Sequence, residues 1–151
     1  MDFSAKYMHT NLIAKDWQRM AKFYQTVFNC TPVPPERDLQ GPAISAATAI
    51  PDAHIRGMHL RLPGFGDDGP TLEIFSYTPE MDHPSSAVNR PGFGHIAFLV
   101  DNMQSAIGAV LENGGKMVGD CVSVPVKGKG QVTFAYLTDP EDNVIEVQSW
   151  S

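Results

Sequence analysis

The feature that most constrains the fold of this 151-residue chain is an internal repeat, a β-α-β-β-β pattern that occurs twice. Each half starts with a strand-like run that carries a histidine, His9 or His95. Each half ends with a strand-like run that carries a glutamate, Glu73 or Glu146. The four runs are Tyr7–Leu12, Thr71–Phe75, Phe93–Phe98 and Val144–Val147. The pattern predicts two similar modules, because a repeated arrangement of this length implies a repeated structural unit.

A helix is predicted after each histidine strand. Apolar residues recur at helical spacing over Trp17–Phe28 and again over Met103–Leu111. Asp16 precedes the first stripe as an N-cap. Asp101, with Gln104 three residues later, forms a capping-box pattern before the second. Both stripes are predicted to pack on the sheets as ordinary core.

Two hairpins complete the modules. Ile55–Leu62 precedes the Glu73 strand and Gln131–Leu137 precedes the Glu146 strand, with turn residues between the members of each pair. The predicted class is α+β, two βαβββ modules forming a curved mixed sheet around a metal site. The boundaries are 5–78 for module one, 79–91 for the linker and 92–150 for module two, within a single domain 1–151.

The halves differ in one long segment, Thr31–Gly57, which contains five prolines. It is interpreted as a loop with a short helix at Ala43–Ala49. Loops of this length often shape a binding site, although a surface excursion without a role fits the pattern equally well.

Composition sets modest limits on function. The net charge of −6 argues against a nucleic-acid surface. No basic n-region with an apolar stretch and no run long enough to span a membrane is visible, so we expect a cytoplasmic protein. Two cysteines, Cys30 and Cys121, are too few for a disulfide framework and are expected to be reduced, buried or half-buried thiols.

The matched residues predict a metal site with His9, Glu73, His95 and Glu146 as ligands. A carboxylate in an apolar strand is costly to bury unless something pairs with it. Two imidazole nitrogens and two carboxylate oxygens suit Zn, Ni, Co, Mn or Fe. Taken singly, each histidine is more often a hydrogen-bonded core residue. A further histidine, His59, also lies on a strand and could line the cavity, since alternation defines only its face.

Four protein ligands leave two adjacent positions of an octahedral ion open for two neighbouring oxygens of a substrate. The ion would polarise a carbonyl and stabilise the enediolate formed when the adjacent proton is removed. Glu146 is the preferred general base, with Glu73 as the other catalytic candidate.

These motifs resemble the vicinal oxygen chelate superfamily. It includes glyoxalase I, methylmalonyl-CoA epimerase, extradiol dioxygenases and the fosfomycin- and bleomycin-resistance proteins. The resemblance is sharpest in the second half and closest to glyoxalase I. The motifs that carry it are His9-Thr10, Leu72-Glu73, Gly94-His95-Ile96-Ala97, Asn113-Gly114-Gly115 and Asp139-Pro140-Glu141-Asp142-Asn143-Val144-Ile145-Glu146.

The resemblance implies a metal-dependent isomerase or lyase of the glyoxalase or epimerase type. It implies one divalent ion per site, a small-molecule substrate with vicinal oxygens, and a homodimer. The site is formed within one chain or shared across that dimer. Ile13 and Tyr77 stand where glyoxalase I typically has Arg and Asn, and Glu73 stands where the epimerases usually have Gln. The alternatives are an Fe(II)-dependent ring-cleaving dioxygenase and a small-molecule-binding resistance-type protein.

Overall fold

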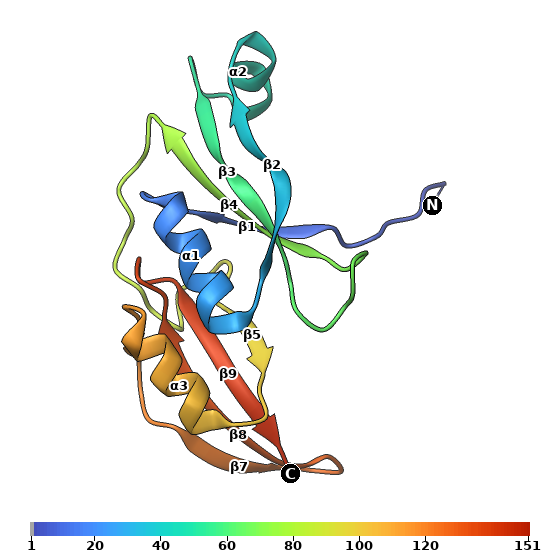
Figure 1. Cartoon of the computed structure of the whole chain (residues 1–151), viewed down its shortest axis with the longest axis vertical. Coiled ribbons are helices and arrows are strands. Elements are labelled where there is room, and N and C mark those ends of the chain that lie inside the picture. The colour runs from blue at the N-terminus through green and yellow to red at the C-terminus, as the bar shows by residue number, and fades with distance from the viewer. Residues whose placement is uncertain (1) are drawn as a thin grey trace. The chain divides into compact units, whose positions relative to one another are not determined.

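The structure is a computed structural model that describes residues 2–151 (Figure 1). It contains two compact units, the first ending at Asp82 and the second running from His83 to Ser151. The predicted mixed α+β class is confirmed, with one mixed sheet in each unit. None of the described helices has the length and apolar character needed to cross a bilayer.

The first unit is a four-stranded sheet in the order β1-β4-β3-β2. Strand β1 runs parallel to β4, whereas β3 is antiparallel to both β4 and β2. Its elements are β1 His9–Ile13, α1 Trp17–Phe28, β2 Thr31–Leu39, α2 Pro42–Thr48, β3 His54–Arg61 and β4 Thr71–Thr78. The predicted helix, hairpin and glutamate strand of the first half are therefore confirmed.

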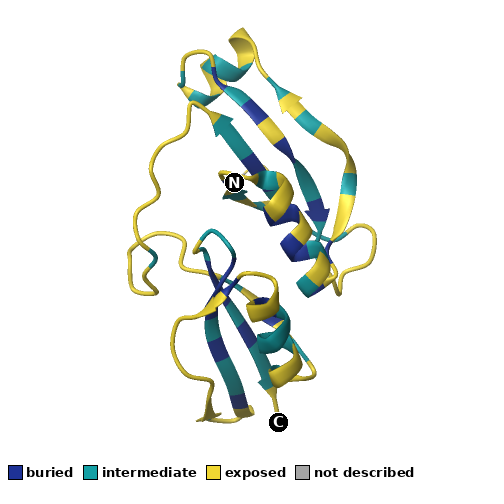
Figure 2. Ribbon diagram, turned by 60° about the vertical axis from the view of Figure 1, so that its left-hand side comes forward, coloured by how far each residue is buried: buried dark blue, intermediate teal, exposed yellow. Residues whose placement is uncertain are grey.

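Helix α1 covers one face of this sheet and forms the core of the unit. The Asp16 side chain caps the helix by accepting a hydrogen bond from the Arg19 N–H, as predicted. The helix packs on β3 and β4, and Figure 2 shows buried residues both on the helix and along these strands. The fully buried side chains include Met20, Tyr24, Leu60, Leu72 and Ile74. Because side chains alternate along a strand, residues next to Leu72 and Ile74 point to the opposite face.

The second unit repeats this arrangement. Its sheet order is β5-β9-β8-β6, with β7 also paired to β8, and β5 runs parallel to β9. Helix α3 contacts β8 and β9. The elements are β5 Ile96–Leu99, α3 Met103–Glu112, β6 Lys116–Met117, β7 Val122–Val126, β8 Gly130–Thr138 and β9 Val144–Trp150.

The N-cap predicted for the second helix was wrong by one residue. Asn102, not Asp101, caps α3, and its side chain accepts a hydrogen bond from the Ser105 N–H. An amide oxygen satisfies the same free N–H that a carboxylate would. With this correction each repeated histidine, His9 and His95, lies seven residues before the cap of its helix.

The interpretation of Thr31–Gly57 as a loop was also wrong, although its short helix is confirmed as α2. Its first nine residues form strand β2, which pairs with β3 at the edge of the sheet. An edge strand tolerates prolines, because one row of its N–H groups has no partner strand. The pairing register shifts between Val33 and Arg37, where Pro34 and Pro35 interrupt the ladder.

The two cysteines are expected to differ sharply in reactivity. Both are free thiols, and Cys30 is buried, whereas Cys121 is exposed, contrary to the expectation for that residue. Burial raises the pKa of Cys30 to about 12, so only about 10⁻⁴ of it is thiolate at pH 8. A disulfide reagent at pH 8 should therefore titrate one thiol per native chain and two in denaturant. Rapid reaction of two native thiols, or of Cys30 in a Cys121→Ser variant, would contradict this.

Candidate metal centre

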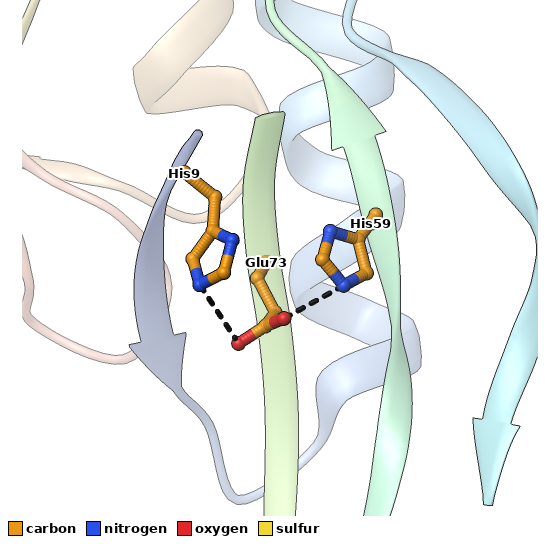
Figure 3. Close-up of side chains that lie close together, drawn as sticks. All are labelled: His9, His59 and Glu73. Atoms are coloured by element: carbon orange, nitrogen blue, oxygen red, sulfur yellow. Dashed lines mark ion pairs between the residues drawn. The ribbon is translucent and has the colours of Figure 1, made fainter. Parts of the chain in front are cut away.

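Glu73 occupies the centre of the candidate site because it lies on β4, between β1 and β3. Its partner across the parallel pair is Asn11, and its partner across the antiparallel pair is His59. His9 lies two residues before Asn11 and therefore on the same face of β1. This face is opposite the one that α1 covers, so the sheet presents these side chains away from the core (Figure 3).

Three of these side chains form a tight cluster. His9 Nε2 lies 3.7 Å from Glu73 Oε1, and His59 Nε2 lies 2.6 Å from Glu73 Oε2. The two imidazole rings meet edge to face, with centroids 5.5 Å apart. His59 and Glu73 are 17% and 13% exposed, whereas His9 is 41% exposed. The cluster is thus half-buried and open to solvent on the side of His9.

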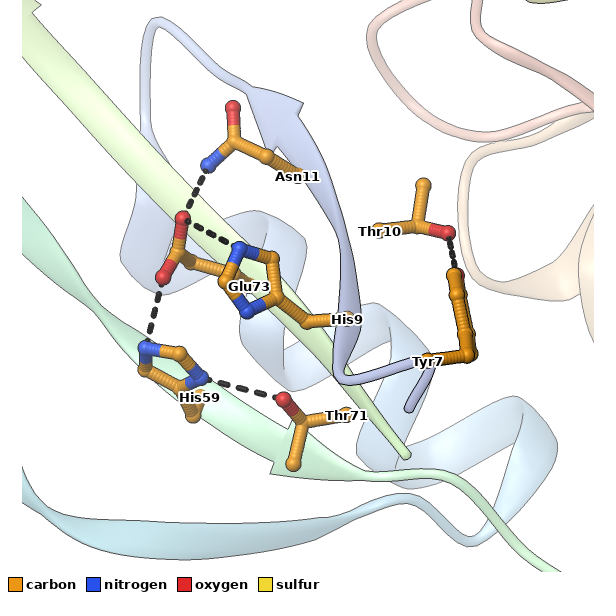
Figure 4. A network of polar contacts seen from close by, with 7 residues as sticks. All are labelled: Tyr7, His9, Thr10, Asn11, His59, Thr71 and Glu73. Atoms are coloured by element: carbon orange, nitrogen blue, oxygen red, sulfur yellow. Dashed lines mark hydrogen bonds and ion pairs between the residues drawn. The ribbon is translucent and has the colours of Figure 1, made fainter. Parts of the chain in front are cut away.

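Polar neighbours fix the cluster in place (Figure 4). Asn11 Nδ2 donates to Glu73 Oε1 at 2.8 Å, so both carboxylate oxygens of Glu73 have a partner. On the far side of His59, Nδ1 lies 3.0 Å from Thr71 Oγ1. Each polar atom of the His59 ring is therefore engaged, and the ring plane is set by two contacts.

An aromatic side chain, that of Phe75, also packs against His59. The two rings meet edge to face, with centroids 5.9 Å apart. A Cβ at Gly57 would lie 2.4 Å from Phe75 Cδ1, so the absence of a side chain there leaves room for this ring. Burial lowers the pKa of His59, and nearby Arg37 and His9 act in the same direction against the opposing pull of Glu73. The environment therefore favours a neutral imidazole.

The second unit carries the matching pair. His95 Nε2 lies 2.9 Å from Glu146 Oε2, and Gln148 Nε2 donates to Glu146 Oε1 over a longer distance of 3.4 Å. The strand partners of Glu146 are Ala97 on β5 and Tyr136 on β8. The His95 and Tyr136 rings are in edge contact at 5.1 Å.

The strand registers show that the two units are equivalent position by position. His9 and His95 each precede the residue opposite the glutamate by two, so the predicted ligands lie as one His–Glu pair in each unit. The remaining two positions differ: Asn11 and His59 in the first unit correspond to Ala97 and Tyr136 in the second.

The sequence predicted neither Asn11 nor Tyr136 as a site residue, and for His59 it allowed a place in the cavity wall but no ligand role. Alternation along β1 is a signal that could have identified Asn11, which lies two residues after His9. The other two depend on hairpin register, which the variable length of the turns leaves open.

The donor set fits a divalent transition ion. Imidazole nitrogen and carboxylate oxygen are ligands of Zn and of Fe, Co, Ni and Mn. Ligands about 2.1 Å from one ion lie about 3–4 Å from each other, and His9 and Glu73 already stand 3.7 Å apart. His9, His59 and Glu73 each offer an atom within 4.8 Å of the others. The cluster therefore needs only small side-chain movements to surround an ion.

A family model and several solved structures match this chain. Residues 8–136 match the family model described as the Glyoxalase/Bleomycin resistance protein/Dioxygenase superfamily. No curated protein matches the chain significantly.

Several solved structures share the fold. A glyoxalase family protein from Bacillus cereus aligns with a TM-score of 0.82 and 14% identity over 99% of this chain and 96% of its own. A fosfomycin resistance protein, FosX, from Listeria monocytogenes aligns with a TM-score of 0.58 and 16% identity, over 99% of this chain and 93% of its own. The family model covers most of the chain, and these structures share its fold. The chain therefore belongs to the glyoxalase, bleomycin resistance and dioxygenase superfamily, also called the vicinal oxygen chelate superfamily.

Proposed function

We propose that the protein is a metal-dependent isomerase or lyase that removes a proton from a carbon next to a carbonyl or thioester. The observation that carries this proposal is the His–Glu pair found at the same register in each unit, His9 with Glu73 and His95 with Glu146. In the proposed site both pairs bind one divalent ion, either within one chain or between the chains of a homodimer. The family contributes the expectation of a small-molecule substrate.

The two glutamates have different surroundings, which supports different roles. Both oxygens of Glu73 have close partners, Asn11 at 2.8 Å and His59 at 2.6 Å. Among residues 2–151, Glu146 has one close partner, His95 at 2.9 Å, and its other oxygen has only the long contact with Gln148. Glu146 is therefore freer to take a proton, and Glu73 is better suited to stay fixed as a ligand.

The proposed reaction depends on the bound ion, on a general base and on residues that orient the two glutamates. A divalent ion bound by the two pairs would polarise the substrate's carbonyl when the carbonyl oxygen and a neighbouring substrate oxygen approach the ion. Glu146 takes the proton from the adjacent carbon and returns it to a neighbouring carbon, which completes an isomerisation. His95 orients Glu146, while Asn11 and His59 hold Glu73 in place. The electron pair of the broken C–H bond enters the carbonyl system and returns when the proton is restored.

Exchange of substrate protons with solvent tests the proposal directly. Metal-free protein in deuterated water is given Zn²⁺, Ni²⁺, Co²⁺, Mn²⁺ or Fe²⁺ and a panel of 2-oxoaldehyde adducts and acyl-CoA thioesters. We expect at least one substrate to incorporate deuterium at the carbon beside the carbonyl, and a chelator should abolish this incorporation. Tight binding of a small molecule such as fosfomycin, without exchange or turnover, would favour a binding or resistance role instead.

One observation favours a second candidate, a ring-cleaving dioxygenase. His9, His59 and Glu73 provide two imidazoles and one carboxylate on three adjacent strands, and this ligand set with open positions is typical of iron(II) oxygenases. Oxygen uptake in the presence of Fe²⁺ and a catechol, with no proton exchange on the carbonyl panel, would establish this reading over the first.

A further inference from the structure

The first unit has a metal-binding residue type at a position where the second unit has none. His59 faces Glu73 across the β3–β4 pair, and Tyr136 occupies the equivalent position facing Glu146. His59 comes from a different strand than His9, so the two rings approach Glu73 from opposite sides (Figure 3). A neutral histidine is a strong ligand for divalent transition ions, whereas a neutral tyrosine is a weak one.

The hydrogen bonds of His59 permit the tautomer that a metal requires. Its Nδ1 contacts the Thr71 hydroxyl at 3.0 Å, and a hydroxyl can either donate or accept. When Nδ1 carries the proton and donates to Thr71, the lone pair of Nε2 points into the cluster. A metal-bound histidine usually has such a partner on its other nitrogen, and that partner fixes the ring orientation. When no ion is present, the ring can reverse these roles and donate from Nε2 to Glu73.

The ring is also held in place by packing. Phe75 contacts one edge of the His59 ring, and the space above Gly57 accommodates Phe75. His59 is 17% exposed, much less than His9. A side chain fixed in this way loses little conformational freedom when it binds an ion, so the site is preorganised.

We propose that His59 is a direct metal ligand, so that His9, His59 and Glu73 bind the divalent ion through three adjacent strands of the first unit. The inference adds a ligand to the metal site of the proposed function. It rests on that function for the catalytic use of the ion. It adds a ligand that the equivalence of the two halves does not predict, because His59 has no histidine counterpart in the second unit.

Nitrogen NMR of the histidine rings in the full chain tests this inference with Zn²⁺ alone as the probe. On titration of metal-free protein, Nε2 of His59 should move to the chemical shift of a zinc-bound nitrogen, as should Nε2 of His9. His54 lies on the same strand but binds Asp38 instead, so its ring should not respond. This measurement needs no substitution and separates a ligand from a residue that only supports Glu73.

Calorimetric zinc titrations of variants give a second readout. We expect His59→Ala to weaken zinc binding by more than the about 10- to 100-fold that loss of a residue contacting only a ligand typically costs. We expect His54→Ala to leave the affinity unchanged. An unchanged affinity in His59→Ala, or a His59 ring that stays uncoordinated at saturation, would overturn the inference and leave the four-ligand site intact. His95→Ala separates the two ideas. If that variant binds zinc normally while His59→Ala does not, the four-ligand site is wrong and the inference stands. If the wild-type protein binds no zinc, both are wrong.

Discussion

Replacing Glu146 with Gln is expected to slow exchange of the substrate's α-proton by about 10²–10⁴-fold, the usual contribution of a general base. The amide has the same shape but cannot accept the proton. In the part of the chain that the structure describes, Glu146 has a single close partner, His95 at 2.9 Å, which leaves the carboxylate able to reach a substrate. Rates are measured by deuterium incorporation in metal-saturated protein, with bound metal quantified in each sample.

Glu73→Gln is the matched control, because Glu73 occupies the equivalent position in the first unit. One of its oxygens accepts a hydrogen bond from Asn11, and the other lies 2.6 Å from His59 Nε2. This variant should mainly weaken metal binding and should recover exchange as the metal concentration rises. If Glu73→Gln remains inactive at metal saturation while Glu146→Gln exchanges normally, the base is Glu73.

The repeat made the architecture predictable because it constrains two modules at once. A histidine strand, a capped amphipathic helix and a closing hairpin each have local signals in side-chain period and turn residues. Both helices and the strands of Glu73 and Glu146 follow these signals closely. The one-residue error at Asn102 arose because Asp101 and Asn102 can both cap a helix, and the choice depends on backbone angles.

What the sequence did not reveal depends on partners distant in the chain. Strand β2 contains three prolines, which argue against a central strand but not against an edge strand. Strand β2 lies at the edge because β4 pairs with both β1 and β3, which leaves β2 only the outer side of β3. No local sequence pattern encodes this strand order. The proximity of His59 to Glu73 likewise depends on the register of the β3–β4 pair, set by the nine residues from Leu62 to Pro70. A shift of one residue would have turned His59 to the core face.

Strand register also depends on the turn between β8 and β9, because this turn places Glu146 opposite Tyr136. Asp139 starts the turn and is 1% exposed. Its Oδ1 accepts the N–H groups of Glu141 and Asn143 at 2.9 and 3.0 Å. Both of its oxygens also accept from Asn143 Nδ2. The carboxylate thus satisfies half-buried donors that would otherwise lose a partner.

Asp139→Ala is therefore expected to lower the free energy of unfolding by about 3 kcal/mol, because it removes a charged acceptor and leaves several donors unsatisfied. Urea denaturation followed by circular dichroism measures this change. Asp139→Asn keeps one acceptor oxygen and should lose less. Asp120 lies exposed in the loop between β6 and β7 of the same unit, so Asp120→Ala should change stability by less than about 0.5 kcal/mol. If Asp139→Ala is as stable as Asp120→Ala, the turn is held by its backbone alone, and the register of Glu146 does not depend on this side chain.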